Sequence, residues 1–372
     1  MRKAMASLAV FGLLATGGLS ACTSDDGDGG AANSGGGSKT KSTGQGKIGV
    51  ILPDTKSAQR WKTDDPKFLK QAFDSAGVPV DIQNAEGDRN RFIQIGNSMI
   101  ESGVKVLMVT NLDSPSSKVV LDKAKAAGIK TIDYDRLTLN GGADYYVSFD
   151  NKAVGLLQAT ELNKCLEDKN IKNPIIAELN GSPTDNNATE FKSGYDEVLQ
   201  PIYDRAEYTK GPDQWVADWA NDEAGVVFAQ MLAQQPKIRG VVAANDGLAN
   251  AVIEVLRKKK LAGVVPVTGQ DATVQGLQNI LTGEQCMTVF KNIKNEALEA
   301  AKLAIALYNG ETPATGGVSQ KDVESGAYVP FVSLKPEPIT KGNISKVIGA
   351  GFATKPEVCK GKYAQLCEEN GI

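Results

Sequence analysis

Short apolar runs alternate with amphipathic segments along the chain from residue 47 onward. In the first half, apolar and β-branched runs predict strands at 48–52, 78–83, 104–109, 130–133 and 145–148, and segments of helical period predict helices at about 64–76, 90–102 and 115–127. Ser114 followed by Pro115 is typical of a helix start, with Ser114 as the N-cap. Strands that alternate with helices in this way indicate parallel β-α-β units.

The same alternation resumes after residue 150. It predicts strands near 175–179, 206–209, 240–243, 264–268 and 286–290, and helices near 151–166, 186–199, 220–234, 246–259, 272–282 and 294–308. A folded part of about 325 residues exceeds the size at which one hydrophobic core stops growing. The sequence therefore predicts an α/β protein with two doubly wound parallel-sheet lobes.

The first residues have the composition of an export signal. Met1-Arg2-Lys3 carries positive charge, residues 4–19 are apolar but short for a membrane span, and Leu19-Ser20-Ala21-Cys22 matches the lipobox of bacterial lipoproteins. We expect a signal peptide at 1–21 and a lipid on Cys22; the alternative is an ordinary signal peptide in which Cys22 has no role. Residues 22–46 are rich in Gly, Ser and Asp, which predicts a flexible tether.

Composition excludes several classes of function. The chain contains no histidine, which removes Ser/His and Cys/His catalysis and most zinc sites. Its net charge of -3, with both signs interspersed, does not suggest a nucleic-acid groove. The sequence thus predicts no catalytic residue, no metal, no cofactor and no nucleic-acid partner.

Four cysteines remain after Cys22, an even number in a chain expected to be exported. Cys359 and Cys367 flank a short loop, and we expect them to form a disulfide. Cys165 and Cys286 form a second bridge or remain buried thiols; four cysteines allow three pairings, and the sequence alone leaves these possibilities open.

Polar planar side chains gather in the loops that follow the predicted strands, where parallel sheets bind ligands. These loops are Gln59-Arg60-Trp61, Tyr134-Asp135-Arg136, residues 182–187, Ala244-Asn245-Asp246, Gly269-Gln270-Asp271 and Phe290-Lys291. Sugar hydroxyls both donate and accept hydrogen bonds, so Asp, Asn and Arg side chains suit them. The three tryptophans, Trp61, Trp215 and Trp219, lie in or beside such loops and could cover the apolar face of a pyranose, although Trp215 is as readily a core residue.

These loops give the sequence a strong resemblance to the periplasmic D-xylose-binding proteins of sugar ABC transporters, within the ribose/galactose-type superfamily, over residues 47 to about 345. The resemblance is carried by Lys47-Ile48-Gly49-Val50, Arg60-Trp61, Tyr134-Asp135-Arg136, 148–151, 181–183 with 185–187, 213–216 with Trp219, Asn245-Asp246, 269–272 and 287–289 with Lys291. It implies that Arg60, Asp135, Arg136, Asp185, Asn187, Asn245, Asp271 and Lys291 hydrogen-bond the sugar, that Trp219 stacks on it and that Trp61 helps. Asp246 is better explained as a helix cap, Asn186 need not face the sugar, and Asp150 and Asn151 suit a lobe crossing with helix capping.

The resemblance also implies a type I periplasmic binding protein whose chain crosses between the lobes three times, near 148–151, 290–294 and 330–336. The N-terminal lobe would comprise 47–149 plus 293–329, and the C-terminal lobe 150–292 plus 330–372. Such a receptor works as a monomer outside the cytoplasmic membrane. It closes its lobes around a monosaccharide and delivers the sugar to the transporter permease.

Other functions remain possible at this point. The receptor could take glucose, ribose or arabinose instead of D-xylose, or it could inform a sensor kinase. A glycosidase would need an acid and base pair among Asp135, Asp185 and Asp271, but the interleaved cations favour ionised carboxylates. A sugar-sensing repressor would need a DNA-binding domain where the signal peptide and tether stand.

Overall fold

A computed structural model describes residues 46–372. The predicted signal peptide at 1–21, the lipidation site Cys22 and the tether at 22–46, apart from its last residue, lie outside the described residues. Within the described part, every helix is too short or too polar to span a lipid bilayer.

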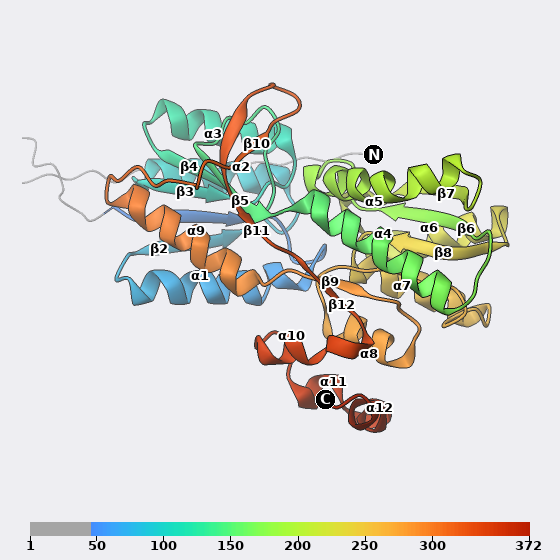
Figure 1. Cartoon of the computed structure of the whole chain (residues 1–372). Helices are drawn as coiled ribbons and strands as arrows, with labels where there is room; N and C mark the ends of the chain where they lie inside the picture. Colours follow the sequence, from blue (N-terminus) through green and yellow to red (C-terminus); the bar gives the residue numbers. More distant parts are fainter. Residues whose placement is uncertain (1–45) are drawn as a thin grey trace, which may run out of the picture. The chain divides into compact units, whose positions relative to one another are not determined.

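The N-terminal lobe contains a seven-stranded sheet in the order β10-β11-β5-β4-β3-β1-β2 (Figure 1). Its strands are β1 (Ile48–Leu52), β2 (Val80–Asn84), β3 (Val106–Val109), β4 (Lys130–Tyr134), β5 (Tyr145–Phe149), β10 (Ser319–Lys321) and β11 (Tyr328–Leu334). All neighbours pair in parallel except β10 with β11. The five strands predicted for this part of the chain are present, with ends shifted by no more than two residues.

Helices cover both faces of this sheet, as the alternating pattern predicts. Apolar side chains of α1 (Asp64–Ser75) and α9 (Ile293–Tyr308) pack on one face, and those of α2 (Arg89–Glu101) and α3 (Ser114–Ala126) pack on the other. The N-cap of α3 is Asp113, which accepts a hydrogen bond from the Ser116 amide, so the prediction of Ser114 as the cap is wrong by one position. Asp113 precedes the helix with extended backbone, so its carboxylate reaches the free amide of Ser116, whereas Ser114 is already the first residue of the helix.

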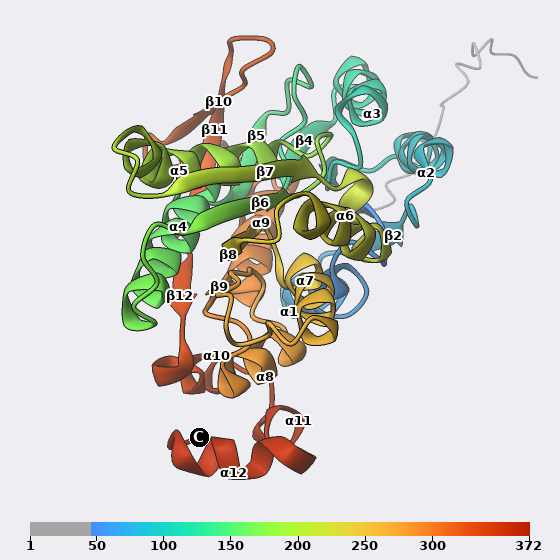
Figure 2. The ribbon, with the colours of Figure 1, turned by 90° about the vertical axis from the view of Figure 1, so that its right-hand side faces the viewer.

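The C-terminal lobe contains a parallel sheet in the order β7-β6-β8, sandwiched between helices (Figure 2). The strands are β6 (Ile175–Asn180), β7 (Thr209–Trp215) and β8 (Ile238–Ala243), and the helices are α4 (Asn151–Asp168), α5 (Asn186–Asp204), α6 (Asn221–Gln234) and α7 (Asp246–Lys258). A single apolar cluster joins this sheet to its helices. The helix α8 (Val274–Thr282) and the antiparallel pair of β9 (Thr288–Phe290) with β12 (Glu337–Ile339) complete the lobe.

Two strands of this lobe differ from the prediction. The strand expected at 206–209 overlaps β7 only at Thr209, because β7 begins there and continues through Gly211 and Pro212 to Trp215. Gly and Pro read as a loop, but an edge strand tolerates a proline. The expected strand at 264–268 is reduced to an isolated bridge between Val267 and Val241, because Pro266 cannot donate to a ladder.

Three segments connect the lobes, leading from β5 to α4, from β9 to α9 and from β11 to β12 (Figure 1). The fold is therefore the predicted pair of doubly wound lobes joined by a three-segment hinge. The boundary expected at residue 330 falls inside β11, which pairs with β5 through Leu334. Sheet pairing thus assigns 330–334 to the N-terminal lobe, and the third crossing lies between Leu334 and Glu337. Asp150 is the N-cap of α4 at the first crossing, in agreement with the prediction.

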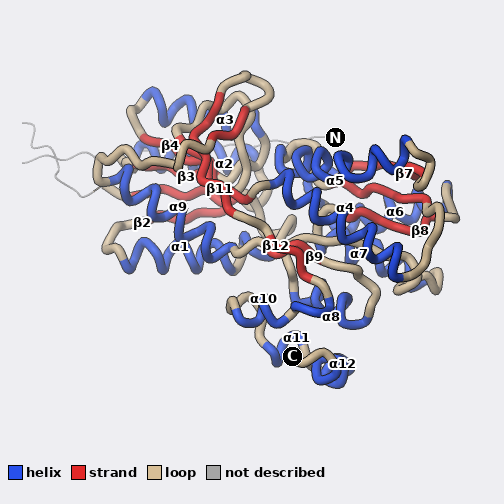
Figure 3. The backbone as a smooth tube through the Cα atoms, viewed as in Figure 1, coloured by secondary structure: helices blue, strands red, loops and turns tan. Residues whose placement is uncertain are grey.

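Short helices form the end of the chain (Figure 3). They are η3 (Lys341–Asn343), α10 (Ser345–Gly349), α11 (Lys355–Val358), η4 (Gly361–Tyr363) and α12 (Ala364–Glu369). Their apolar side chains pack on α8, and a disulfide joins Cys359 to Cys367, the pair expected from the sequence. Phe352 reaches further and contacts Phe68 of α1 and Phe290 of β9.

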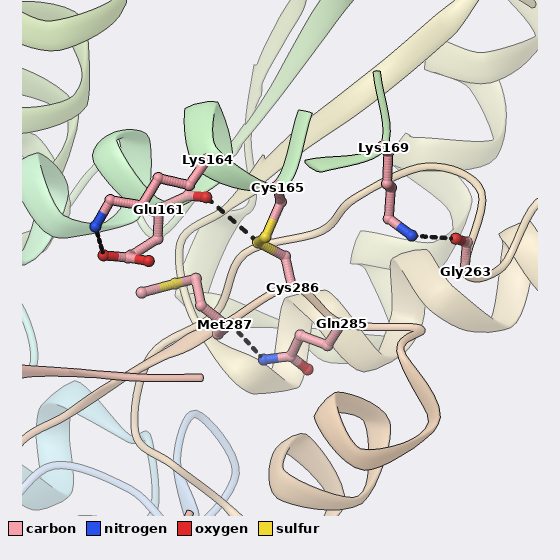
Figure 4. Close-up of a disulfide and its surroundings, with 8 residues drawn as sticks. All are labelled: Glu161, Lys164, Cys165, Lys169, Gly263, Gln285, Cys286 and Met287. Carbon is pink, nitrogen blue, oxygen red and sulfur yellow. Dashed lines mark hydrogen bonds and ion pairs between the residues drawn. A yellow bond between two sulfur atoms is a disulfide. The ribbon is translucent and has the colours of Figure 1, made fainter. Parts of the chain in front are cut away.

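A second disulfide joins Cys165, near the end of α4, to Cys286, just before β9 (Figure 4). Of the two alternatives that the sequence leaves open, the structure therefore has the bridge. It ties α4 to the strand that leads into Lys291 and the second crossing.

Candidate functional site

The ten residues predicted to bind a ligand all line one cavity of about 30 Å³. They come from the N-terminal lobe, from the C-terminal lobe and from the second crossing: Arg60, Trp61, Asp135, Arg136, Asp185, Asn187, Trp219, Asn245, Asp271 and Lys291. Ser57, Ala58, Phe191 and Gln270 complete the lining. Residues up to 234 positions apart in sequence thus meet at one place.

Each of these residues is held where a strand ends and a loop or helix begins. Arg60 and Trp61 lie on the short helix η1 (Gln59–Trp61) after β1, and Trp219 ends η2 (Ala217–Trp219) after β7. The remaining members follow β4, β6, β8 and β9 or the bridge at Gln270. Carboxyl ends of parallel strands lie at the same edge of a sheet, which explains the convergence.

Arg60 is fixed by three carboxylates. Its Nε and Nη2 donate to both oxygens of Asp65 at 2.8 and 2.7 Å, a bidentate pair. Nη2 also donates to Glu296 at 2.6 Å, and Nη1 donates to Asp135 at 2.7 Å. Arg60 is 4 % exposed, so these pairs lie in a poorly solvated environment. One of its five N–H donors remains for a ligand, and the other four hold Asp65, Glu296 and Asp135.

Asp135 is the centre of the charged cluster. Besides Arg60, its carboxylate faces the Lys291 ammonium at 3.4 Å, and Asn187 of the other lobe donates to its backbone carbonyl at 3.0 Å. Burial alone would raise the pKa of this carboxyl, but the charges of Arg60, Lys291 and Arg136 hold the pKa well below its usual range. Asp135 is therefore an ionised hydrogen-bond acceptor.

Arg136 and Asp185 form an ion pair between the lobes. The Nε of Arg136 lies 3.0 Å from a carboxylate oxygen of Asp185, and both side chains are nearly inaccessible. The same carboxylate oxygen accepts a hydrogen bond from the Trp219 indole at 3.1 Å. Asp185 is also the N-cap of α5 and accepts from the Asn187 amide. One carboxylate thus fixes a helix start, an aromatic ring and an interlobe contact.

Three residues of the lining have left-handed backbone conformations. The φ angles are 63° at Asp135, 54° at Trp219 and 101° at Asp271. Non-glycine residues rarely adopt such angles, and those that do cluster at ligand clamps. Trp219 also requires a glycine opposite it, because a Cβ on Gly181 would lie 2.1 Å from its ring.

Aromatic rings form the apolar part of the lining. The Arg60 guanidinium lies 4.2 Å from the ring centroid of Trp61, and the indole nitrogen of Trp61 is buried with no hydrogen-bond partner among the described residues. Phe191 meets Trp219 edge to face at 6.4 Å. Trp215, in contrast, packs on the core of the C-terminal lobe and does not line the cavity, which is the core role considered for it.

Comparison with known proteins agrees with the family resemblance seen in the sequence. Residues 48–312 match the family described as periplasmic binding protein domain. The chain belongs to this family. A D-xylose-binding periplasmic protein of Escherichia coli is 35 % identical over 314 residues, covering 84 % of this chain and 92 % of the relative. A multiple sugar-binding periplasmic receptor of Rhizobium radiobacter is 33 % identical, covering 85 % and 93 %. A solute-binding protein of Clostridium phytofermentans solved with β-D-glucose superimposes with a TM-score of 0.76 at 28 % identity, covering 84 % of this chain and 99 % of that one.

In this periplasmic binding protein, two capping assignments differ from the prediction. Asn245, expected to contact ligand, is the N-cap of α7 and accepts from the Leu248 amide, which leaves its Nδ2 for the cavity. Asp246, expected to be that cap, is instead buried behind the site and accepts hydrogen bonds from Thr273, Thr288 and Gln285. Asn245 precedes the helix with extended backbone, so its side chain reaches the free amides first.

The expectation that neighbouring cations leave no cavity carboxyl with a raised pKa is also wrong in part. It holds for Asp135. Burial raises the pKa of Asp185 and of Asp271, against the opposing charges of Arg136 and Lys291 respectively. Behind Arg60, burial also raises the pKa of Glu296 well above its usual value. Desolvation outweighs the ion pairs in these binding-protein carboxyls, an effect that a sequence does not reveal.

Four lining residues escaped the sequence analysis. Gln270 belongs to one of the polar loops noted in the sequence but was not chosen as a ligand-binding residue, and Ser57 lies three positions before Arg60; proximity to a strand end could have indicated both. Phe191 lies inside α5, one turn beyond Asn187, where helical spacing brings it to the same face. Ala58 offers no chemical signal.

Proposed function

We propose that this protein captures free D-xylose between its two lobes and delivers it to the permease of an ABC importer. The observation that carries the proposal is the convergence of the ten residues on one cavity, in a chain 35 % identical to a D-xylose-binding periplasmic protein. The protein acts as a monomer outside the cytoplasmic membrane, held there by a lipid on Cys22. It uses no cofactor and binds no nucleic acid.

The chemistry of the lining suits a small polyol. Ionised Asp135 accepts hydrogen bonds, Lys291 and the amide of Asn245 donate them, and a sugar hydroxyl can do both. The buried indole nitrogen of Trp61 is a further donor for which a sugar oxygen would be a partner. Trp219 supplies a flat apolar surface for the C–H face of a pyranose ring.

The interlobe contacts supply the closing mechanism. A cavity of about 30 Å³ is far below the size of an open ligand pocket, so entry of a sugar requires the lobes to separate. The contacts that would break on opening are the Arg136–Asp185 ion pair and the hydrogen bonds from Asn187 to Asp135. A sugar that pairs with groups of both lobes favours the closed form, which is the form that the permease would recognise.

Another monosaccharide is the main alternative. A relative binds multiple sugars by its name, and a solved neighbour contains β-D-glucose. A glycosidase is disfavoured because the family consists of binding proteins, although Asp185 and Asp271 have raised pKa values.

Calorimetric titration of the purified protein with D-xylose, glucose, ribose, arabinose and galactose tests the ligand. We expect D-xylose to bind most tightly. Tight binding of another sugar with none of D-xylose would refute the choice of sugar, and release of product from a xyloside would refute the receptor function.

The site itself is tested by Asp271→Ala, which leaves Lys291 with less opposing charge and should weaken binding by at least about 2 kcal/mol. Asp122→Ala, at an exposed position of α3, is the matched control and should bind normally. Wild-type affinity in the Asp271 variant would mean that the sugar binds elsewhere.

The lipid anchor is tested by fractionation. Wild-type protein should sediment with membranes, and Cys22→Ser should appear in the soluble fraction with unchanged sugar affinity. Equal distribution of the two proteins would exclude a lipid on Cys22.

A further inference from the structure

Gln270 lines the cavity and lies between the strand β9 and the start of α7. It makes a single bridge with Val289, its backbone carbonyl accepts from the amide of Asp246, and it precedes Asp271. Its side chain is 3 % exposed, so each of its polar atoms needs a partner within the protein or a ligand.

The orientation of the Gln270 amide is determined by its neighbour. Its Nε2 group donates to a carboxylate oxygen of Asp271. A carboxylate oxygen accepts and the amide oxygen also accepts, so the amide nitrogen must face Asp271. The amide oxygen Oε1 therefore points away from Asp271, and it is buried without a hydrogen-bond donor among the described residues.

An unpaired buried acceptor is costly, and where its residue lines a ligand cavity, as Gln270 does, a bound ligand can satisfy it. The adjacent Asp271 has a φ of 101°, a conformation typical of residues constrained by function. The backbone amide of Asp271 donates to Val289 at 2.8 Å, which holds this conformation in place.

We infer that Gln270 is a specificity-determining residue whose Oε1 accepts a hydrogen bond from one hydroxyl of the bound sugar, while its Nε2 orients Asp271 toward a second hydroxyl. This inference rests on the proposed function. Each of these two acceptors can take one hydroxyl, so a sugar that lacks or inverts one of the two hydroxyls leaves an acceptor unpaired.

Gln270→Met tests the inference, because methionine has a similar length and removes both polar atoms. Wild-type and variant proteins are titrated with D-xylose and with each monodeoxy-D-xylose. We expect the variant to bind D-xylose about tenfold more weakly than wild type does. One deoxy sugar should bind the wild-type protein more weakly than D-xylose does. The variant should bind that deoxy sugar and D-xylose with equal affinity.

Gln285→Met is the matched control. Gln285 is also buried, also donates its amide to an aspartate (Asp246) and also has an unpaired Oε1, but it does not line the cavity. Thermal unfolding measures any change in the stability of this variant, and its ranking of the deoxy sugars should equal that of wild type.

The outcomes separate the two ideas. If wild type binds no sugar, the proposed function fails and the inference fails with it. If wild type binds D-xylose and Gln270→Met loses no affinity, or loses the same factor for every deoxy sugar, the inference alone fails. Gln270→Leu provides a second variant in case the methionine variant does not fold: it also removes both polar atoms, and wild-type affinity in it would also overturn the inference.

Discussion

Asp133 makes stability depend on pH in a way that a single substitution should remove. It is fully buried in β4, and its two carboxylate oxygens accept from the amide and hydroxyl of Thr138, each at 2.8 Å. These bonds close the loop that presents Asp135 and Arg136 to the cavity. Burial, aided by the charge of Asp322, raises the pKa of Asp133 from 3.8 to about 7.

The sign and size of the effect follow from proton linkage. Between pH 4 and pH 7 the folded protein holds a proton on Asp133 that the unfolded chain has lost, so the free energy of unfolding falls as pH rises. Raising a pKa from 3.8 to about 7 corresponds to about 4 kcal/mol, at about 1.4 kcal/mol for each pKa unit. The loss is complete above pH 7 and absent below pH 4.

Asp133→Asn should eliminate this loss while preserving the loop. The asparagine oxygen can accept from the Thr138 amide, and its NH₂ group can donate to the Thr138 hydroxyl, which rotates to accept. We expect the variant and wild type to have similar stability at pH 4 and the variant to be more stable by about 4 kcal/mol at pH 8.

The assay is urea unfolding at pH 4, 5, 6, 7 and 8, followed by circular dichroism. The difference between variant and wild type is the informative quantity, because other buried carboxyls such as Asp246, whose pKa burial raises to about 7, cancel in it. Asp74→Asn, in an exposed pair with Lys70, serves as the control and should change stability by less than about 1 kcal/mol at every pH. A difference for Asp133→Asn that does not change with pH, or that favours wild type at high pH, would refute the reasoning.

Two further predictions concern packing and the covalent framework. Gly181→Ala should displace the Trp219 ring, which should cost about 1–3 kcal/mol of stability and weaken sugar binding. Gly225→Ala, whose Cβ would meet no atom closer than 3.9 Å, is the control and should leave stability and affinity nearly unchanged. Thermal unfolding and calorimetry check both variants, and normal sugar affinity in Gly181→Ala would contradict the prediction. Replacing Cys165 and Cys286 together by alanine removes a link across 121 residues and should lower stability by about 2–5 kcal/mol in thermal unfolding, and an unchanged melting temperature would show that the bridge does not stabilise the folded chain.

The fold was predictable because its signal is local. Buried parallel strands appear as apolar runs and their helices as amphipathic segments, so the pattern alone gives two doubly wound lobes. The strand predictions are wrong where a strand is not buried on both faces, or where a proline leaves it without a backbone N–H donor. The edge strand β7 exposes a polar sequence containing Pro212, and Pro266 interrupts the run beside β8.

The convergence of the ten residues on one cavity was predictable for a related reason, since loops at the carboxyl ends of strands meet wherever the strands are parallel. The hydrogen-bond partners of the site residues were harder to predict from the sequence. Arg60 looks like a ligand-binding residue in sequence, yet Glu296, which accepts from it, lies 236 positions later on α9. The burial that raises the pKa of Asp185 and Asp271 is likewise a property of the assembled lobes.

The charged cluster has an asymmetry that bears on how the two lobes close. Arg60 is held by Asp65 of α1 and Glu296 of α9, both in the N-terminal lobe, so lobe opening leaves these bonds intact. Arg136 has its carboxylate, Asp185, across the cleft. Opening therefore leaves Asp135 in place on Arg60 while it separates Arg136 from Asp185. The first sugar contacts should then form on the rigid Arg60–Asp135 side, and the Arg136–Asp185 pair should form as the cleft shuts.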